Sequence, residues 1–224
     1  TLNAYPVVVL GDITRNGNLA VGNALTVYGY LTVNGDNSGA GGGSIVVKDG
    51  GVLHITGNLT TGVIVTVEEG GTLIIDGYYT ANGGQIYVKD GGNIEIAGDF
   101  TTNSAPITID EGANIKVGGD FLGGGGQQNI NGNFIIAGEV DYGTVTAYIG
   151  ANGAWVVGDD FSAVYGVVSP CSRVYLIGGL PSYTGACSGY STTIPSSIIP
   201  EVCDVMGSPT VSISASANPI CSGI

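Results

Sequence analysis

The chain has 224 residues, of which 41 are glycine, and 18 acidic against 5 basic side chains give a formal net charge of −13. The glycines follow no G-X-Y period, which excludes collagen, and 43% apolar residues are enough for a folded core. The acidic balance argues against nucleic-acid partners, which require Lys and Arg at the phosphates, and against an anionic membrane surface. No apolar run reaches the roughly 18 residues of a membrane span, so we expect no membrane insertion. The sequence has no charged-then-apolar leader at Thr1 and no initiator Met, so we expect an already processed chain.

Short strands are predicted from the first residues onward. Apolar residues lie two apart at Val7 and Val9, and again at Leu31 and Val33, and each pair is followed by a Gly-Asp step. The segments 19–21 and 25–27 predict further strands between these two. The run N-S-G-A-G-G-G at 37–43 predicts a flexible protruding loop.

The central stretch 44–121 contains four copies of one sequence repeat, here called a phrase. The phrases begin at Ile45, Val65, Ile86 and Ile107, and each has an alternating apolar triplet, an acidic-Gly-Gly corner (Gly-Ala in the fourth), a second alternating triplet and a final Gly. This final Gly falls at 57, 77, 98 and 119, so the steps are 20, 21 and 21 residues. A fixed period of this length, made of strands, is typical of a solenoid. The Gly-Gly corners supply the positive φ that a sharp bend requires.

Equivalent inward residues are expected to stack on one another from coil to coil. Two strands of three or four residues cannot bury their apolar face alone, so the next coil must pair with them at about 4.8 Å. The expected rows are Leu53, Leu73, Ile94 and Ile115; Ile55, Ile75, Ile96 and Val117; and an aromatic row of Leu59, Tyr79, Phe100 and Phe121.

The phrase continues more weakly near Phe134, Trp155 and Val174, and the Gly run 123–126 predicts a bulging turn in place of a third side. We therefore predict an all-β fold, a parallel β-solenoid that we expect to be right-handed, with three sides, one of them short, and about nine coils of roughly 19–24 residues. The predicted divisions are a solenoid at 1–180, a Cys-containing loop or cap at 181–208 and a strand-like tail at 209–224.

All four cysteines, Cys171, Cys187, Cys203 and Cys221, lie near the C-terminal end. Without a C-x-x-C spacing they indicate disulfides and an oxidising, extracellular compartment. Four cysteines allow three pairings. We favour Cys171 with Cys187, while Cys221 pairs with Cys203 or belongs to a neighbouring module.

The tail 209–224 alternates cleanly at Val211, Ile213, Ala215 and Ala217. It resembles the first strand of the Ig-like or PKD-like modules of large surface proteins of Bacteroidota, many of which carry Gly-rich β-helical stretches ahead of such modules. The resemblance implies a secreted, surface-attached or fibrous protein exported by type IX secretion, and no catalytic residues. No C-terminal sorting domain is visible, which leaves the export route open.

Two acidic rows follow the corners. One contains Asp12, Asp36, Asn58, Asp99, Asp120, Glu139 and Asp160; the other contains Asp49, Glu69, Asp90 and Glu111, continued by Asn131 and Asn152. Stacked carboxylates repel unless something compensates, which leaves two interpretations. Asp99, Asp120 and Asp160 are weak candidates for binding Ca²⁺, the one cofactor considered. The favoured interpretation is that these side chains accept hydrogen bonds from turn N–H groups.

We expect no catalytic residues and no enzymatic activity. His54 is the single histidine, the five bases are scattered, and Asp159-Asp160 is the one adjacent acid pair. Outward threonines and tyrosines at 60, 61, 101, 102, 28, 30, 78 and 87 could form a glycan- or ice-binding face, or be ordinary strand residues on a solvated face. Asn58-Leu59-Thr60 also matches the glycosylation pattern.

The predicted function is a non-enzymatic extracellular structural or adhesive rod at the cell surface, in the form of a fibre- or array-forming subunit or a stalk. Its partners would be other copies of itself or neighbouring modules, and glycans in the alternative of a carbohydrate-binding or polysaccharide-cleaving module. Open solenoid ends template further pairing, so Val7 and Val9 at one end and Val211 and Ile213 in the tail are the self-association candidates. If the chain is a fragment, the tail instead begins the next module.

Overall fold

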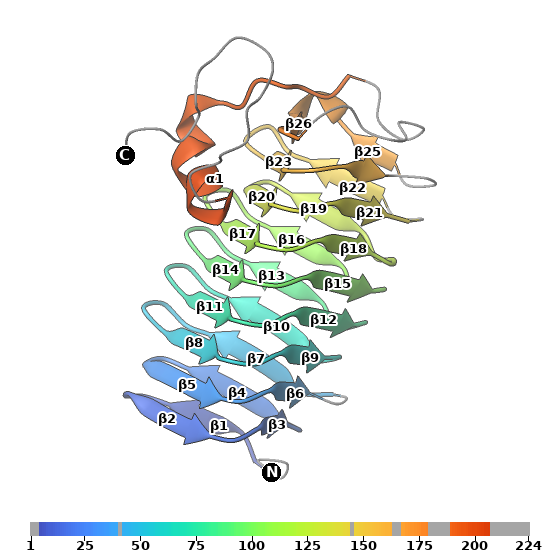
Figure 1. The fold of residues 1–224 in the computed structure, drawn as a ribbon. Helices are drawn as coiled ribbons and strands as arrows, with labels where there is room; N and C mark the ends of the chain where they lie inside the picture. The colour runs from blue at the N-terminus through green and yellow to red at the C-terminus, as the bar shows by residue number, and fades with distance from the viewer. Residues whose placement is uncertain (1–4, 40–41, 144–145, 163–166, 179–188, 207–224) are drawn as a thin grey trace.

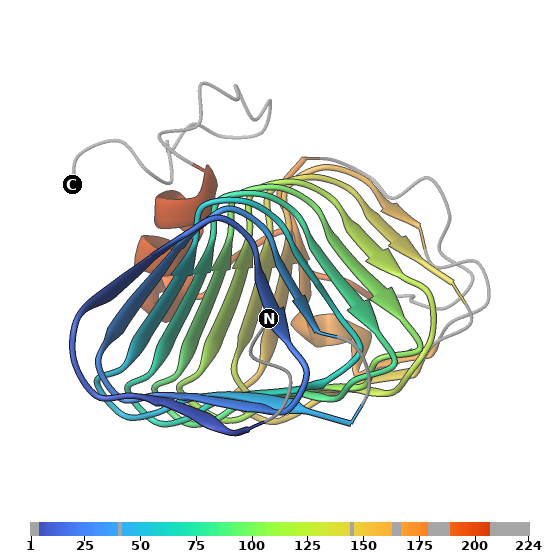
Figure 2. The same cartoon turned by 90° about the horizontal axis from the view of Figure 1, so that it is seen from below.

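The computed structural model describes residues 5–39, 42–143, 146–162, 167–178 and 189–206. Figure 1 shows coils stacked along one axis, and Figure 2 shows their three-sided outline. The strands described form three parallel sheets of nine, nine and eight strands, which confirms the predicted parallel β-solenoid. They make up eight coils with three strands each and a ninth with two. The handedness stays a prediction.

The strands succeed one another from sheet 1 to sheet 2 to sheet 3 in the first eight coils, and the described strands of the ninth belong to sheets 1 and 2. Sheet 1 contains β1 (Val7–Val9), β4 (Ala24–Val27), β7 (Ser44–Val47), β10 (Ile64–Val67), β13 (Ile86–Val88), β16 (Ile107–Ile109), β19 (Gln128–Ile130), β22 (Thr146–Ile149) and β25 (Val167–Ser169). Sheet 2 contains β2 (Ile13–Asn16), β5 (Tyr30–Asn34), β8 (Val52–Ile55), β11 (Thr72–Ile75), β14 (Asn93–Ile96), β17 (Asn114–Val117), β20 (Asn133–Ile136), β23 (Ala154–Val157) and β26 (Val174–Leu176). Sheet 3 contains β3 (Leu19–Val21), β6 (Asn37–Gly39), β9 (Leu59–Thr61), β12 (Tyr79–Asn82), β15 (Phe100–Asn103), β18 (Phe121–Gly123), β21 (Val140–Tyr142) and β24 (Phe161–Ser162).

The predicted inward rows are confirmed by the strand register. Leu73 pairs with Leu53 and Ile94, and Ile75 pairs with Ile55 and Ile96, so each row runs parallel to the axis. These side chains are buried, while the residues between them point outward. Alternation of period two therefore places one apolar face of every strand in a continuous core.

The third row forms the predicted aromatic stack. The Tyr79 and Phe100 rings lie 5.0 Å apart and within 16° of parallel, and Phe121 follows at 5.4 Å from Phe100. Phe134 and Trp155 extend the cluster toward the C-terminal end with stacked rings 5.5 Å apart. The aromatic cluster thus replaces the aliphatic core of the earlier coils.

The acidic-Gly-Gly corners adopt the predicted conformation. Gly50, Gly70 and Gly91 have φ of 69°, and Gly112 has φ of 78°. This left-handed region is available to glycine at little cost, which explains the repeated residue at the sharp bend between sheets 1 and 2.

Two glycine-rich segments predicted to leave the coil instead contain strands of sheet 3. Residues 37–39 form β6, in which Asn37 pairs with Leu19 and Leu59, so the predicted loop is wrong there; 40–41 lie outside the described residues. Likewise Gly123 ends β18, so the third side of that coil is present. A Cβ at Gly123 would lie 2.5 Å from the Tyr142 ring, so the missing side chain makes room for a core aromatic.

The segment predicted as a loop or cap at 181–208 is partly helical. After the short helix η1 (Cys171–Arg173) and strand β26, Ser191 pairs with Tyr175 beyond the edge of sheet 2, and η2 (Ser196–Ile198) leads into α1 (Ile199–Met206). Pro200 lies in the first turn of α1, where its missing N–H has no partner to lose. None of the helices among the described residues has the length and apolar character to cross a bilayer.

Candidate functional site

The outer face of sheet 2 is polar in its first half and apolar in its second. Its central outward row reads Thr32, His54, Ile74, Glu95 and Lys116, and continues as Ile135, Val156 and Tyr175. Helix α1 lies beside the C-terminal half of sheet 2 (Figure 1). There Ile198 and Val202 join Ile135 and Val156 in a second buried cluster. The N-terminal half of the row is left open to solvent beside the helix.

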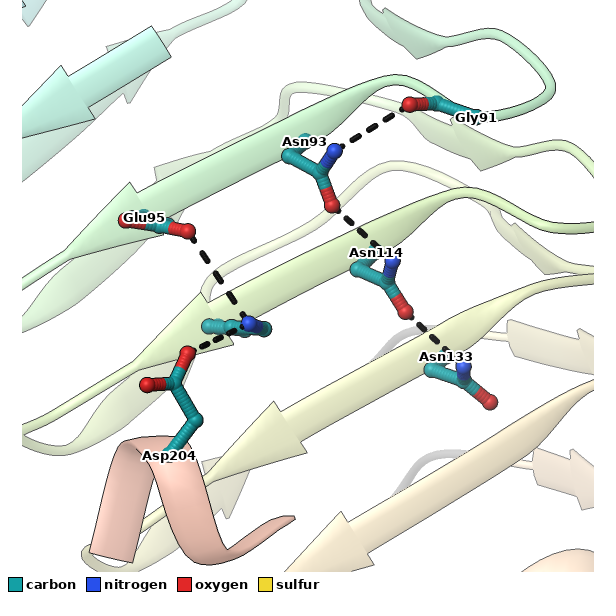
Figure 3. Close-up of polar contacts among 7 residues, drawn as sticks. Gly91, Asn93, Glu95, Asn114, Asn133 and Asp204 are labelled. Atoms are coloured by element: carbon teal, nitrogen blue, oxygen red, sulfur yellow. Dashed lines mark hydrogen bonds and ion pairs between the residues drawn. The ribbon is translucent and has the colours of Figure 1, made fainter. Parts of the chain in front are cut away.

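An open groove of about 420 Å³ lies where α1 ends on this face. Its charged lining residues are Asp76, Glu95, Lys116 and Asp204. Lys116 Nζ lies 2.6 Å from Asp204 Oδ2 and 3.9 Å from Glu95 Oε1, so one ammonium group serves a strand carboxylate and a helix carboxylate (Figure 3). With three carboxylates against one ammonium, the groove is negatively charged.

His54 lies one coil before the groove-lining residue Ile74, and its side chain is paired with an acid. Its Nε2 lies 3.0 Å from both carboxylate oxygens of Asp76, one of the groove residues. The His54 side chain is half-buried, with 24% of it exposed. In this arrangement the carboxylate orients the ring.

A ladder of asparagine side chains runs beside the groove. Asn114 Nδ2 donates to Asn93 Oδ1 at 2.9 Å, and Asn133 Nδ2 donates to Asn114 Oδ1 at 2.8 Å (Figure 3). Sequence reasoning missed it, although the residues recur at one position of successive phrases. Asn16 with Asn34 and Asn82 with Asn103 form the same contact elsewhere.

The first acidic row caps turns from coil to coil, as the favoured interpretation predicted. Asp36 Oδ1 accepts the backbone N–H of Asn58, Asp99 Oδ1 that of Asp120, and Asp120 Oδ1 that of Glu139, at 2.8–3.0 Å. Asp160 Oδ1 accepts the N–H of Phe161. Each acceptor satisfies a donor, so these carboxylates have a structural role in the turns. Ca²⁺ binding at Asp99, Asp120 or Asp160 stays a prediction.

The glycosylation motif and the second acidic row are also in structural contacts. Both ends of the Asn58 amide are engaged, because Oδ1 accepts the Tyr78 N–H and Nδ2 donates to Asp36. In the second row Asn152 Nδ2 donates to Glu111 Oε1 at 2.7 Å. Within the described part of the chain, no three His, Cys, Asp or Glu side chains gather in a metal-binding group.

Basic side chains bridge neighbouring coils along the rod. Lys48 pairs with Glu68, and Lys89 Nζ lies 3.3 Å from Asp110 Oδ2. The hydrogen bond to Glu68 raises the pKa of the Lys48 ammonium. Lysines that are far apart in the sequence thus align with acids one coil away.

The predicted threonine and tyrosine face is divided by the structure. Thr61 and Thr102 point into the core and are buried, so the prediction that they face outward is wrong. Thr60 and Thr101 do point outward, in register with Thr80 on sheet 3. Tyr28, Tyr30 and Tyr78 are exposed, and Tyr87 is half-buried.

The cysteine and self-association candidates are only partly described. Cys171 and Cys203 are disulfide-bonded, whereas Cys187 and Cys221 lie outside the described residues, so the pairing stays a prediction. Val9 is buried and Val7 packs against the core, which leaves their backbone as the available edge. Val211 and Ile213 lie outside the described residues.

Comparisons with known proteins add little to this geometry. No family model matches the sequence, and no curated protein matches it. Among solved structures, one described as a "TibC-catalyzed hyper-glycosylated TibA55-350 fragment" is 19% identical, covers 81% of this chain and 99% of its own, and has a TM-score of 0.16. A TM-score this low carries no argument about this chain.

Proposed function

We propose that this chain is a non-enzymatic structural or adhesive rod, secreted to the cell surface as in the Bacteroidota proteins that its tail resembles, and that it assembles with copies of itself or with neighbouring modules. One observation carries the proposal: polar side chains on the outside are bonded along the axis, from one coil to the next. The Asn93–Asn114–Asn133 ladder and the Asp99–Asp120 caps are its main examples.

Axial bonding of this kind favours a mechanical role. A repeat protein is stabilised chiefly by contacts between nearest neighbours, so each inter-coil hydrogen bond strengthens the rod in the direction in which it would be pulled. The disulfide-bonded state of Cys171 and Cys203 supports an oxidising compartment. Both features suit an exposed extracellular rod.

The ends of the rod support assembly. Of the described strands, β1, β2 and β3 are the edges of their sheets at one end, and β24 and β25 are edges at the other. Parallel edges template further strands. Tyr5, Val8, Leu10 and Ile13 are exposed near the N-terminal edge, which favours an apolar end-to-end contact.

Electron microscopy and light scattering of the full chain test this proposal. We expect filaments that lengthen with protein concentration, and we expect the double variant Val211→Lys/Ile213→Lys to shorten them if the tail adds as a strand. Ser212→Lys is the matched control, because it faces the other side of the predicted strand. A monomeric wild-type chain at all concentrations would remove the self-assembling role, and filaments unchanged by the double variant would remove the tail from it.

The groove beside α1 favours a second candidate, the carbohydrate-binding or -cleaving module. Carboxylates of Asp76, Glu95 and Asp204 around an open groove could accept hydrogen bonds from sugar hydroxyls, and paired carboxylates are the usual groups of glycoside hydrolysis. A glycan-array screen against wild type and Glu95→Gln tests it. Binding or cleavage that this substitution abolishes would favour the second candidate over the rod.

A further inference from the structure

The outer face of sheet 1 differs from the other two in its charge. None of the nine described strands of sheet 1 contains a charged residue. Sheet 2 contains Arg15, Glu95 and Lys116, and sheet 3 contains Asp141. In a chain with a net charge of −13, one whole side of the rod is therefore uncharged.

The side chains on this face form straight outward rows. Strand register aligns Val46, Thr66, Tyr87, Thr108, Asn129 and Tyr148. The neighbouring outward row includes Ile64 and Thr146, and Ile64 and Tyr148 are exposed by 43% and 50%. β-Branched and aromatic side chains in rows of this kind make a flat surface that another sheet can cover.

Charges begin only where the strands of this sheet end. Lys48 follows β7 and pairs with Glu68 after β10, and Lys89 follows β13 and pairs with Asp110 after β16. These pairs neutralise Glu68 and Asp110 at this margin of the face. The second acidic row (Asp49, Glu69, Asp90 and Glu111) lies at the same corner, and the strands of sheet 1 themselves carry no charge.

We propose that two copies of this chain pair side by side through the outer faces of their sheets 1. The inference rests on the proposed role as a self-assembling rod and names the face that would join rods laterally. Two copies with the same strong negative charge repel each other least where neither presents an acid. Depletion of charged residues is also a compositional mark of a protein–protein interface core.

The size of the face fits such a contact. Nine strands at about 4.8 Å give a length of roughly 40 Å, and three to four residues per strand give a width of about 12 Å. The area is thus on the order of 500 Å² per copy, which reaches the roughly 1,000 Å² in total that a specific interface needs. Two such sheets would lie about 10 Å apart with their strands nearly aligned.

Sedimentation velocity of the full chain at increasing salt tests this pairing. We expect a monomer–dimer equilibrium that strengthens as salt is raised to about 1 M, where the Debye length falls to about 3 Å and the flanking acids are screened. Thr108→Glu places a charge at the centre of the face and should weaken the dimer at least tenfold. Thr101→Glu is the matched control, since Thr101 is an equally half-buried outward threonine on sheet 3.

The outcomes separate this inference from the proposed function. Equal weakening by the two substitutions, or none by Thr108→Glu, would overturn pairing through sheet 1, as would a wild-type chain that shows no lateral pairing at any salt. Filaments that keep their length but lose their double width in Thr108→Glu would support it. If a neutral β-glucan oligosaccharide bound monomeric wild type but not Thr108→Glu, the occupant would be a glycan and the pairing would be wrong.

Discussion

The carboxylate of Asp120 accepts the backbone N–H of Glu139, one coil further along the rod, at a distance of 2.8 Å. The backbone N–H of Asp120 in turn donates to Asp99 at 3.0 Å. Asp120 is therefore an acceptor for the next coil and a donor to the previous one. The like charges of Asp99 and Asp120 are tolerated because each of these carboxylates accepts a hydrogen bond from a backbone N–H.

Removal of one cap should destabilise the rod by about the cost of a lost helix or turn cap. We expect Asp120→Ala to lower the free energy of unfolding by about 1–2 kcal/mol in denaturant titrations. Asp120→Asn should cost less, because Asn58 makes the same contact with Tyr78 elsewhere in the row. Asp141→Ala removes an exposed outward acid from β21 and serves as the control for charge.

Calcium is the alternative explanation for this row, and it predicts a different result. If the carboxylates hold only N–H groups, EDTA should leave the melting temperature unchanged, because no ligand of the native state is removed. A loss of many degrees that Ca²⁺ restores would contradict the capping interpretation. Such a loss should then disappear in Asp120→Ala.

A charge placed in an inward row should damage the core. Ile96 is 3% exposed and pairs with Ile75 and Val117. We expect Ile96→Asp to lower the free energy of unfolding by more than about 4 kcal/mol, since an unpaired carboxylate would be buried between two coils. Thr101→Asp, at an outward position of the neighbouring sheet, should change it little. An unchanged melting temperature for Ile96→Asp would contradict the inward assignment.

The coils could be predicted from the sequence because their signals are local. The alternation of Leu53 and Ile55 indicates the buried face of a strand. The acid-Gly-Gly corner indicates a bend, and the period of about 21 residues indicates a repeat. The same information predicted which residues stack on which. It failed at Asn37 and Gly123, where pairing with the strands on either side outweighs the weak strand propensity of Asn and Gly.

The groove could not be predicted because its parts are distant in the chain. Lys116 and Asp204 are 88 positions apart, and nothing near either residue indicates the other. The helix α1 was not predicted because it is only eight residues long and carries a proline, a residue typical of loops, at its second position. The sequence does contain a signal for an element on the outer face of sheet 2, because the outward residues Ile135, Val156 and Tyr175 are apolar. Apolar residues on both sides of a strand indicate that both faces of the sheet are covered.

The contact between Lys116 and Asp204 should contribute little to holding the helix. Asp204 is 64% exposed, and exposed ion pairs are typically worth about 0.2–1 kcal/mol. A double-mutant cycle with Lys116→Met and Asp204→Ala should give a coupling free energy in that range. Val202→Ala should cost about 2 kcal/mol, because it removes buried methyl groups from the cluster under α1. A coupling free energy larger than the cost of Val202→Ala would show that the ion pair, not the apolar contact, holds the helix in place.

Replacement of Asn37 should stabilise the protein. Its side chain is 1% exposed between Leu19 and Leu59, and neither amide atom has a hydrogen-bond partner in the described structure. We expect Asn37→Leu to raise the free energy of unfolding by about 1–3 kcal/mol, because it removes two unsatisfied polar groups and completes an apolar row. A lower melting temperature would show that Asn37 has a role that the described contacts do not contain.

Two buried tyrosines should make the rod sensitive to alkali. Burial raises the pKa of the Tyr79 and Tyr142 hydroxyls well above the ordinary value of 10.0. A raised pKa in the folded state means that the contribution to stability is full below pH 10 and is lost as the pH rises above it. In that range the unfolded chain releases both protons while the folded chain keeps them.

The free energy of unfolding should therefore fall above pH 10 by about 1.4 kcal/mol per pH unit for each buried tyrosine. The double variant Tyr79→Phe/Tyr142→Phe should remove about twice that slope. Denaturant titrations from pH 8 to pH 12 measure the free energy of unfolding at each pH. Tyrosinate absorbance, recorded alongside, measures the ionisation of the tyrosines. Equal slopes in wild type and the double variant would show that Tyr79 and Tyr142 ionise in the folded rod, which would place water beside the aromatic stack.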